Sequence, residues 1–254
     1  MAKRKTKGKK KGLGWLPDIP DARDHQFKLK KFVRYPTKID LRPQCPPIQD
    51  QGSLGSCTAQ ALVSALEFLD MKYSDGSPLV DYSRLFLYYN ERVYINTVAE
   101  DSGAIIRDGI KSLNRKGICP ESMWDYTISK FTEMPPKECY REAKNYKTVS
   151  YQRINTFDQM KACLATEHPF VFGYAVYDSF YEADNDGIVP MPDLATENML
   201  GGHAVLCVGY NNSDKQFICQ NSWGTGWGDK GFFYMPYEYL KNRNMSDDFW
   251  VIRF

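Results

Sequence analysis

The stretch that most constrains this chain is residues 51–61, Gln-Gly-Ser-Leu-Gly-Ser-Cys-Thr-Ala-Gln-Ala. From Cys57 to about Lys72 the chain has good helix formers, no Pro or Gly, and apolar side chains on nearly every face. A helix with this pattern has to be buried in the middle of a domain. We therefore predict a central helix that begins at Cys57, with Ser56 as its N-cap.

Cys57 would then lie in the first helical turn, where unpaired N–H groups and the helix dipole favour the thiolate, the form that attacks carbonyls. Gly52 and Gly55 allow a tight turn and a close approach of a substrate. The side-chain amide of Gln51 can donate to a developing oxyanion beside the N–H of Cys57. The other interpretation of this stretch alone is a small, buried, structural cysteine.

A nucleophilic thiolate needs a base, and the chain has three histidines. His25 lies in a charged N-terminal segment, and His168 precedes a proline in a predicted loop. His203 opens an apolar run of strand type that is entered through two glycines. His203 is therefore the candidate base.

Asn221 follows His203 in a second strand-like run, residues 217–228. The turn-forming residues 211–215 between the two runs predict adjacent antiparallel strands. Such a hairpin can bring Asn221 to the ring of His203 and orient it. The candidate catalytic residues are Cys57, His203, Asn221 and Gln51.

With these residues the chain resembles the papain-like cysteine proteases, peptidase family C1, and is most similar to bacterial or viral members with a short N-terminal segment. The resemblance covers about residues 35–254. Its motifs are Ile-Asp-Leu-Arg at 39–42, Gln-Gly-Ser-Leu-Gly-Ser-Cys at 51–57, Gly-His-Ala-Val at 202–205 and Asn-Ser-Trp-Gly-Thr-Gly-Trp-Gly at 221–228. Leu54 stands where many secreted members have a disulfide cysteine, and Thr58 where they have a tryptophan; neither change removes the nucleophile.

The resemblance implies an α+β fold of two subdomains, a helical half that carries Cys57 and an antiparallel β-barrel-like half that carries His203 and Asn221, with the active-site cleft between them. The implied activity is that of a cysteine endopeptidase, in which a Cys57 thiolate and a His203 imidazolium form a covalent acyl-enzyme. The resemblance also implies a strongly acidified Cys57 thiol and a Trp223 ring that covers the bond between His203 and Asn221. The alternatives are an aminopeptidase or transpeptidase of the same chemistry, or an inactive papain-like binding protein.

The resemblance further implies substrate-binding positions. Ser102 and Gly103 match the pair that binds the substrate backbone, although one glycine of that pair is replaced by Ser102. Gly201 and Ala204 match residues that line the second pocket. One of two acidic residues near the C-terminus, Asp247 or Asp248, would lie at the base of that pocket and admit Arg or Lys; the other interpretation is a solvated acidic loop.

The N-terminal region has two parts that differ in composition. Residues 1–12 form a basic tail, and without its seven cationic side chains the formal net charge changes from +2 to −5. We expect a disordered, solvated tail; the alternative is weak contact with nucleic acid or anionic surfaces. Its cationic residues are Lys3, Arg4, Lys5, Lys7, Lys9, Lys10 and Lys11.

Residues 13–34 contain two prolines and an apolar pair at Trp15 and Leu16, a composition that favours an extended segment. This segment is too short for the usual inhibitory propeptide of the family. We expect it to pack on the enzyme surface and to keep the enzyme latent as a plug in the cleft. The alternative is a structural strap that does not touch the cleft.

The remaining pattern places helices first and strands later, which is typical of an α+β protein. We expect a helical subdomain over about residues 43–145 and a β subdomain over about residues 146–254. The predicted helices are 83–94, 102–116 with a stop at Gly117, and 156–165. The predicted strands are 170–177, 201–210, 217–228, 231–235 and 249–254.

The seven cysteines include no C-x-x-C pair, so neither a metal site nor an organic cofactor is expected. An odd count without a secretory signal favours reduced thiols and a cytoplasmic-type compartment. Cys207 and Cys219 fall on adjacent predicted strands and would face each other. We expect no transmembrane segment, a monomer, and peptide or protein substrates.

Overall fold

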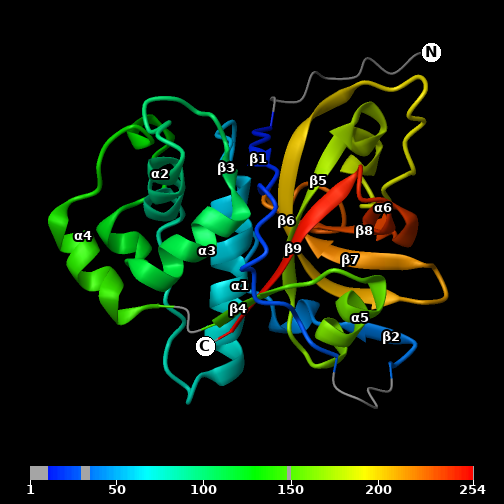
Figure 1. Cartoon of the computed structure of the whole chain (residues 1–254), viewed down its shortest axis with the longest axis horizontal. Coiled ribbons are helices and arrows are strands. Elements are labelled where there is room, and N and C mark those ends of the chain that lie inside the picture. Colours follow the sequence, from blue (N-terminus) through cyan, green and yellow to red (C-terminus); the bar gives the residue numbers. More distant parts are fainter. Residues whose placement is uncertain (1–10, 30–34, 148–149, 254) are drawn as a thin grey trace.

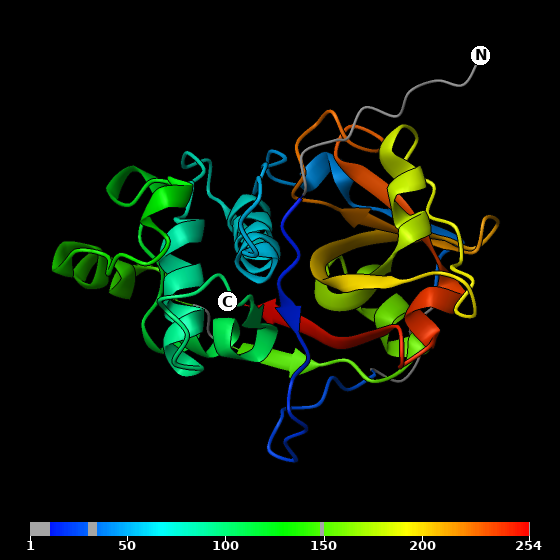
Figure 2. The ribbon, with the colours of Figure 1, turned by 90° about the horizontal axis from the view of Figure 1, so that it is seen from above.

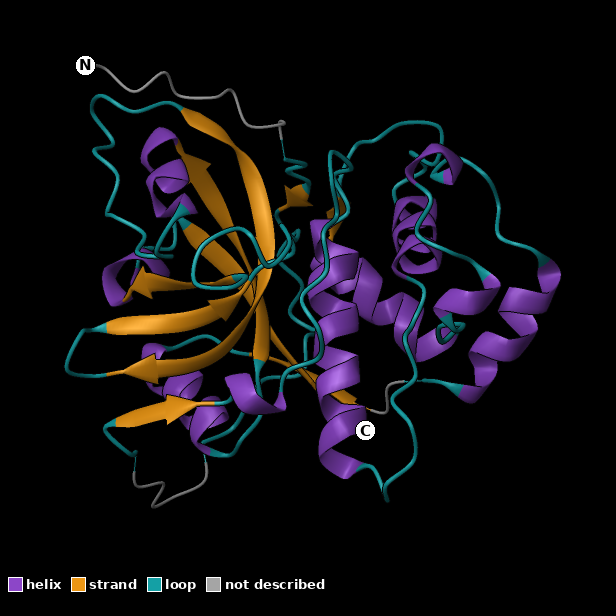
Figure 3. Cartoon of the chain, turned by 180° about the vertical axis from the view of Figure 1, so that it is seen from behind, coloured by secondary structure: helices purple, strands orange, loops and turns teal. Residues whose placement is uncertain are grey.

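The fold is built around one long buried helix, α1 (Cys57–Tyr73), which lies between a group of helices and an antiparallel sheet (Figures 1 and 3). The computed structural model describes residues 11–29, 35–147 and 150–253. Every side chain of α1 from Cys57 to Leu69 is buried, as the all-round apolar pattern predicts. Ser56 holds the N-cap position but does not cap the helix, because its hydroxyl bonds the Tyr126 hydroxyl at 2.5 Å.

The helices that flank α1 come mainly from the first half of the chain. The Ser83 hydroxyl caps α2 by accepting the N–H of Phe86, and Thr156 begins α5 with a capping box, both at the predicted places. The α-helices are α2 (Arg84–Tyr94), α3 (Ile106–Arg115), α4 (Lys137–Glu142), α5 (Phe157–Ala165) and α6 (Tyr237–Lys241). The short 3-10 helices are Arg42–Gln44, Glu121–Met123, Ile128–Lys130, Ala143–Asn145 and Asp178–Asp184.

The predicted start of the third helix at Ser102 is wrong, since α3 begins at Ile106. Gly103 has φ +75°, a left-handed conformation that a right-handed helix cannot contain. The next two residues form β3 (Ala104–Ile105), which pairs in parallel with β1 (Trp15–Leu16) of the N-terminal segment. A tertiary partner therefore takes these residues out of the helix.

The second half supplies most of a seven-stranded sheet whose strand pairs are all antiparallel. The strand order is β4-β9-β5-β6-β7-β8, with β2 on β6, so the described strands form an open path rather than a closed barrel. The predicted hairpin is confirmed, with Cys207 opposite Cys219. The strands are β2 (Lys38–Asp40), β4 (Ser150–Arg153), β5 (Phe170–Tyr177), β6 (Met199–Asn211), β7 (Gln216–Gln220), β8 (Phe232–Pro236) and β9 (Ser246–Arg253).

The N-terminal segment passes between the helical side and the sheet, close to the start of α1 (Figure 2). Contacts on both sides fix it there: Ala104 donates its N–H to the Gly14 oxygen at 2.7 Å, and the Leu13 side chain lies against Gly201. Among the described helices, none is long and apolar enough to cross a membrane.

Candidate active site

The first candidate residue, Cys57, begins α1 and its side chain is fully buried. Burial raises the pKa of its thiol to about 12, although the N–H groups of Ala204 and Gly14, which lie at the sulfur, act in the opposite direction. The expectation of a strongly acidified thiol is therefore wrong for this closed arrangement. The reason is that no water reaches the sulfur, so the charged form loses its solvation.

His203 lies on β6 and is held by Asn221, which follows β7. The His203 Nε2 lies 2.8 Å from the Asn221 Oδ1, and the same oxygen accepts the N–H of Ser222 at 2.8 Å. Because Oδ1 can only accept, Nε2 carries the proton and Nδ1 keeps its lone pair. Nδ1 is buried and has no hydrogen-bond partner among the described residues, so it is free to take a proton.

The surroundings of His203 are apolar and aromatic. The Trp223 ring lies 4.8 Å from the imidazole, centroid to centroid, and the Tyr174 ring packs edge-on at 5.7 Å. Burial lowers the pKa of His203 to about 4, while the bond to Asn221 acts in the opposite direction. In this arrangement thiol and imidazole are therefore both neutral near pH 7.

Gln51 is fixed at both ends of its side-chain amide. Its Oε1 accepts the Ser222 hydroxyl at 2.5 Å, so its Nε2 must be the donor end. Nε2 donates to the Leu54 oxygen at 2.8 Å and to the Gly12 oxygen at 3.2 Å. The amide predicted to hold an oxyanion therefore already holds a backbone carbonyl of the N-terminal segment.

The N-terminal segment contacts the site from Lys11 onward. Lys11 Nζ pairs with Asp50 at 2.9 Å and donates to the Trp223 oxygen at 3.1 Å. The Gly12 N–H donates to the Gly52 oxygen at 3.1 Å. The contact thus begins two residues before the predicted segment, at the end of the predicted basic tail. The other cationic residues of that tail and residues 30–34 lie outside the described part of the chain.

Trp15 fills a pocket of the sheet side. Its ring lies over Gly173, its main chain lies over Gly202, and its indole N–H donates to the Asp248 Oδ2 at 3.0 Å. Asp248 also accepts the N–H of Asp18 at 2.7 Å. Burial and the neighbouring Asp18 carboxylate raise the pKa of Asp248 to about 7, with Arg153 acting against them.

The segment is anchored beyond this pocket by buried charges. Asp18 pairs with Arg153 at 2.9 Å and accepts the Trp250 indole N–H at 2.9 Å. Arg107 of α3 donates to the Ile19 oxygen and pairs with Asp24, both at 2.6 Å.

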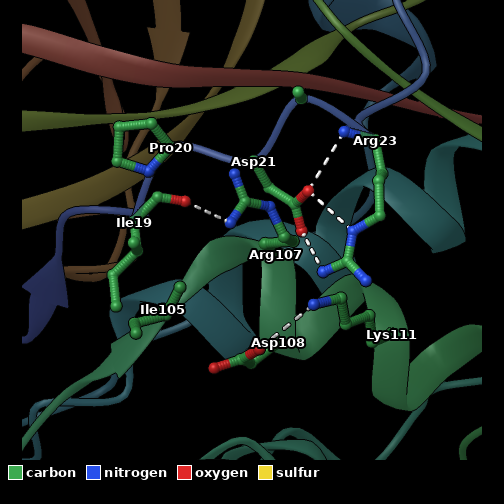
Figure 4. Close-up of a pocket in the computed structure, with 9 residues that line it drawn as sticks. Ile19, Pro20, Asp21, Arg23, Ile105, Arg107, Asp108 and Lys111 are labelled. Carbon is green, nitrogen blue, oxygen red and sulfur yellow. Dashed lines mark hydrogen bonds and ion pairs between the residues drawn. The ribbon is translucent and has the colours of Figure 1, made fainter.

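Figure 4 shows Arg107 beside a cavity of about 430 Å³ between the segment and α3. Charges at that cavity are already paired, for example Arg23 with Asp21 at 2.7 Å. The cavity lies apart from the candidate catalytic residues, whose own cleft is filled by the segment.

The predicted substrate-binding positions are only partly brought together. Gly103 and Gly201 both lie directly against the N-terminal segment. A Cβ added to Gly103 would lie 2.1 Å from the Gly14 oxygen, and a Cβ added to Gly201 would lie 3.2 Å from the Leu13 side chain. The Ser102 hydroxyl bonds the Thr97 hydroxyl at 2.6 Å and the Gly103 oxygen at 3.0 Å, and neither partner belongs to the N-terminal segment.

Of the two acidic candidates for the base of the second pocket, Asp248 reaches the pocket of Trp15. The side chain of Asp247 is 42% exposed and pairs with Arg153 and Arg243. All seven cysteines are free thiols, including Cys207 and Cys219, which the register places opposite each other.

Comparison with known proteins agrees with this geometry. Residues 35–250 match the family model of the papain family cysteine proteases. A peptidase C1-like protein of Acanthamoeba polyphaga mimivirus is 43% identical, over 96% of this chain and 87% of that protein. Peptidase 1 of Dermatophagoides pteronyssinus is 29% identical over 78% of this chain, and the match spans 60% of the mite protein.

Solved structures give the same result. The crystal structure of xylellain, a cysteine protease from Xylella fastidiosa, superposes with a TM-score of 0.90 at 43% identity, covering 96% of this chain and 97% of that one. Digestive procathepsin L 3 of Tenebrio molitor superposes with a TM-score of 0.72 at 17% identity, covering 96% and 76%, which shows a shared fold.

Proposed function

The chain belongs to the papain family of cysteine proteases, and we propose that it is an endopeptidase in which Cys57 is the nucleophile and His203 the general base and acid. The observation that carries this proposal is the bond from His203 Nε2 to Asn221 Oδ1, because this bond leaves His203 Nδ1 unprotonated. The next residue, Ala204, has its N–H at the Cys57 sulfur. Asn221 orients the ring, and Trp223 keeps water from the bond.

The reaction proceeds in two half-reactions. His203 takes the Cys57 proton, and the thiolate forms a C–S bond to the substrate carbonyl carbon, whose oxygen becomes an oxyanion held by Gln51 and the Cys57 N–H. The imidazolium gives its proton to the leaving amine as the C–N bond breaks. Water then attacks the acyl-enzyme, with His203 again accepting a proton, and the C–S bond breaks to restore the thiol.

We further propose that the N-terminal segment keeps the enzyme latent, as a zymogen. Three contacts support this: the Gly12 carbonyl takes the Gln51 donor, the Gly14 N–H lies at the sulfur, and the Trp15 ring fills the pocket above Asp248. A substrate would have to displace all three. The raised pKa of Cys57 and the lowered pKa of His203 have the same cause, the exclusion of water from the covered site.

The remaining assignments follow the same division of the chain. Residues 35–254 are the peptidase domain, with a helical subdomain at about 43–145 and a β subdomain at about 146–254. Residues 13–34 are the pro-like segment, and the part of the chain that contacts the site begins earlier, at Lys11. The substrates are peptides or proteins, the enzyme acts as a monomer, and the basic tail makes weak contacts with nucleic acid or anionic surfaces.

The Gly14→Ala variant tests the proposed function without a change in the catalytic residues. A Cβ at this position would lie 1.8 Å from the Gly55 oxygen, so the segment cannot close as it does here. We expect the full-length variant to hydrolyse an N-acetylated peptide at least about tenfold faster than the native chain, since a cost of about 1.4 kcal/mol to the covered state changes the open population by that factor.

The matched control is Gly226→Ala, because a Cβ there meets no atom within 4 Å. Equal rates for native, Gly14→Ala and Gly226→Ala chains, all active, would contradict latency but not the protease assignment. Hydrolysis of free-amino peptides alone would identify an aminopeptidase. No hydrolysis by any of the three chains would contradict the assignment of Cys57 and His203.

A further inference from the structure

One carboxylate, that of Asp101, links two walls of the cleft that are far apart in the sequence. Gly55 lies two residues before Cys57 and donates its N–H to both Asp101 oxygens, at 3.0 and 3.1 Å. The Tyr88 hydroxyl donates to the Asp101 Oδ1 at 2.5 Å and accepts the N–H of Gly103 at 3.2 Å. A continuous chain of hydrogen bonds therefore runs from Gly55 through Asp101 and Tyr88 to Gly103.

The two ends of this chain both contact Gly14 of the segment. A Cβ on Gly55 would lie 3.5 Å from the Gly14 Cα, and one on Gly103 would lie 2.1 Å from the Gly14 oxygen. The residue after Gly103, Ala104, donates its N–H to that same oxygen at 2.7 Å. The separation of Gly55 and Gly103 therefore sets the space available to a backbone that passes Cys57.

A buried arginine holds this chain in place. Arg92 is fully buried, its guanidinium lies 4.2 Å from the centre of the Tyr88 ring, and it donates to the Val98 oxygen at 2.9 Å and the Glu100 oxygen at 3.0 Å. The same residue therefore fixes the ring that carries the hydroxyl and the loop that carries Asp101. Burial, followed by the bond to Asp101, raises the pKa of Tyr88, so its hydroxyl keeps the proton that it donates.

All seven cysteines are free thiols, so no disulfide joins the turn before Cys57 to the loop at Asp101, and the hydrogen bonds from Gly55 to Asp101 connect the two. Leu54, in that turn, is a buried apolar residue. The N–H of Gly103 is already taken by Tyr88, which leaves the N–H of Ala104 as the donor to a backbone in the cleft.

We propose that Asp101 and Tyr88 are positioning residues of the protease reaction, a role that rests on the proposed function. Asp101 holds the turn that delivers Cys57, and Tyr88 sets the distance from that turn to Gly103 and Ala104. Both act through the backbone and not on the reacting atoms. A displacement of about 1 Å at such a site can cost up to about a hundredfold in rate.

The test uses full-length chains that carry Tyr88→Phe, Asp101→Asn or Asp101→Ala, each made with native Gly14 and with Gly14→Ala. Tyr89→Phe on the same helix and Glu100→Gln beside Asp101 are the matched controls. For each chain we would measure peptide kcat and KM, the rate at which iodoacetamide alkylates Cys57, and the thermal unfolding midpoint.

In the Gly14→Ala background, Tyr88→Phe should raise KM about fivefold and leave alkylation within about twofold, because the bond from Gly55 to Asp101 remains. Asp101→Ala should lower both kcat and the alkylation rate by about tenfold or more, since the Gly55 N–H loses its acceptor. Asp101→Asn should recover part of this loss, because its amide oxygen still accepts that N–H. The two controls should behave as the parent chain.

Variants that melt earlier but keep kcat, KM and alkylation within about twofold of the parent would contradict the proposal and leave a structural role alone. If Asp101→Ala does not fold, Tyr88→Phe and Asp101→Asn decide the question by the same measurements. A parent Gly14→Ala chain without peptidase activity would instead contradict the proposed function. In that case the alkylation rate tests the geometry by itself: a rate slowed by Asp101→Asn would show that Asp101 positions the Cys57 thiol, and an unchanged rate would contradict that as well.

Discussion

At the scale of single residues, the proposed nucleophile and the proposed base are both neutral in the covered site. Burial raises the pKa of Cys57 to about 12 and lowers that of His203 to about 4, so the ion pair expected of this family does not exist while the segment is in place. In the proposed active form, from which the segment has been displaced, water returns and both shifts shrink. The helix N-terminus and the Ala204 N–H then favour the thiolate, and His203 takes up the proton.

Asp248 gives a residue-scale prediction about specificity. It lies at the pocket of Trp15 and binds an indole N–H there, so we expect that pocket to prefer a substrate side chain with an N–H donor, such as Trp, Arg or Lys, over Phe. Asp248→Ala in the Gly14→Ala chain should reduce this preference about tenfold, because a hydrogen bond to a charged group contributes roughly 1.5–3 kcal/mol. The measurement is kcat/KM for peptides that differ only at the residue entering the second pocket.

Asp247→Ala is the control, since its side chain is partly exposed and pairs with Arg243. A preference for Trp, Arg or Lys over Phe that is the same with and without the Asp248 carboxylate would contradict its role in specificity.

The sequence predicts the site at residue scale only where chemistry and spacing are both distinctive. Gln51, His203 and Asn221 could be named because a thiol nucleophile needs a base, an orienting group and an oxyanion donor. Ser222, Tyr88 and Asp101 could not, because each bonds a group that only the tertiary fold brings near. Local sequence has no signal for a hydroxyl that accepts a backbone N–H fifteen residues away.

At the scale of elements, local rules predict most boundaries and fail where a distant segment intervenes. The Ser83 and Thr156 caps lie where their side chains mark helix starts, and β5 has the predicted bounds. The sequence misplaces the start of α3 because Ala104 and Ile105 pair with Trp15 and Leu16 of the N-terminal segment in an extended form. That binding depends on residues about ninety positions away in the chain, which no helical periodicity reports.

The turn between α5 and β5 gives an element-scale prediction about pH. His168 Nδ1 lies 2.6 Å from the Thr166 oxygen, and burial, followed by Arg253 and Lys72, lowers the pKa of its ring to about 4. An unfolded histidine titrates near 6.5, so below that pH the unfolded chain binds more protons than the folded chain. The stabilisation by neutral His168 is complete above pH 6.5 and is lost as the pH falls to 4.

We therefore expect the native chain to lose about 1 kcal/mol of unfolding free energy relative to His168→Asn when the pH falls from 7 to 4.5. This figure is reduced from the full linkage value because the His168 side chain is partly exposed to solvent. Urea unfolding at the two pH values measures this difference. The exposed His25→Asn variant is the control. A difference that stays constant or grows in acid would show that His168 is not held neutral by this turn.

At the scale of the whole molecule, the helical side carries Cys57, the proposed nucleophile, the sheet carries His203, the proposed base, and the N-terminal segment lies between them (Figures 1 and 2). Composition and the order of helices and strands predict this two-sided arrangement. They do not predict the path of the segment, which depends on buried pairs such as Asp18 with Arg153 and on close contacts at glycines such as Gly14. The proposed catalysis and the proposed latency therefore depend on the same cleft.

The most direct test of this account is the intact mass of the full-length chain after exposure to a peptide-like epoxide near pH 5.5, where an ordinary thiol of pKa about 8.5 is almost wholly protonated. We expect one adduct on Cys57 in the Gly14→Ala chain, labelling at least about tenfold slower in the native chain, and no adduct when Cys57→Ser is added. Equal labelling of the native and Gly14→Ala chains would contradict the proposal that the N-terminal segment blocks access to Cys57. The absence of any adduct in Gly14→Ala would contradict the central claim that Cys57 is the activated nucleophile of a protease.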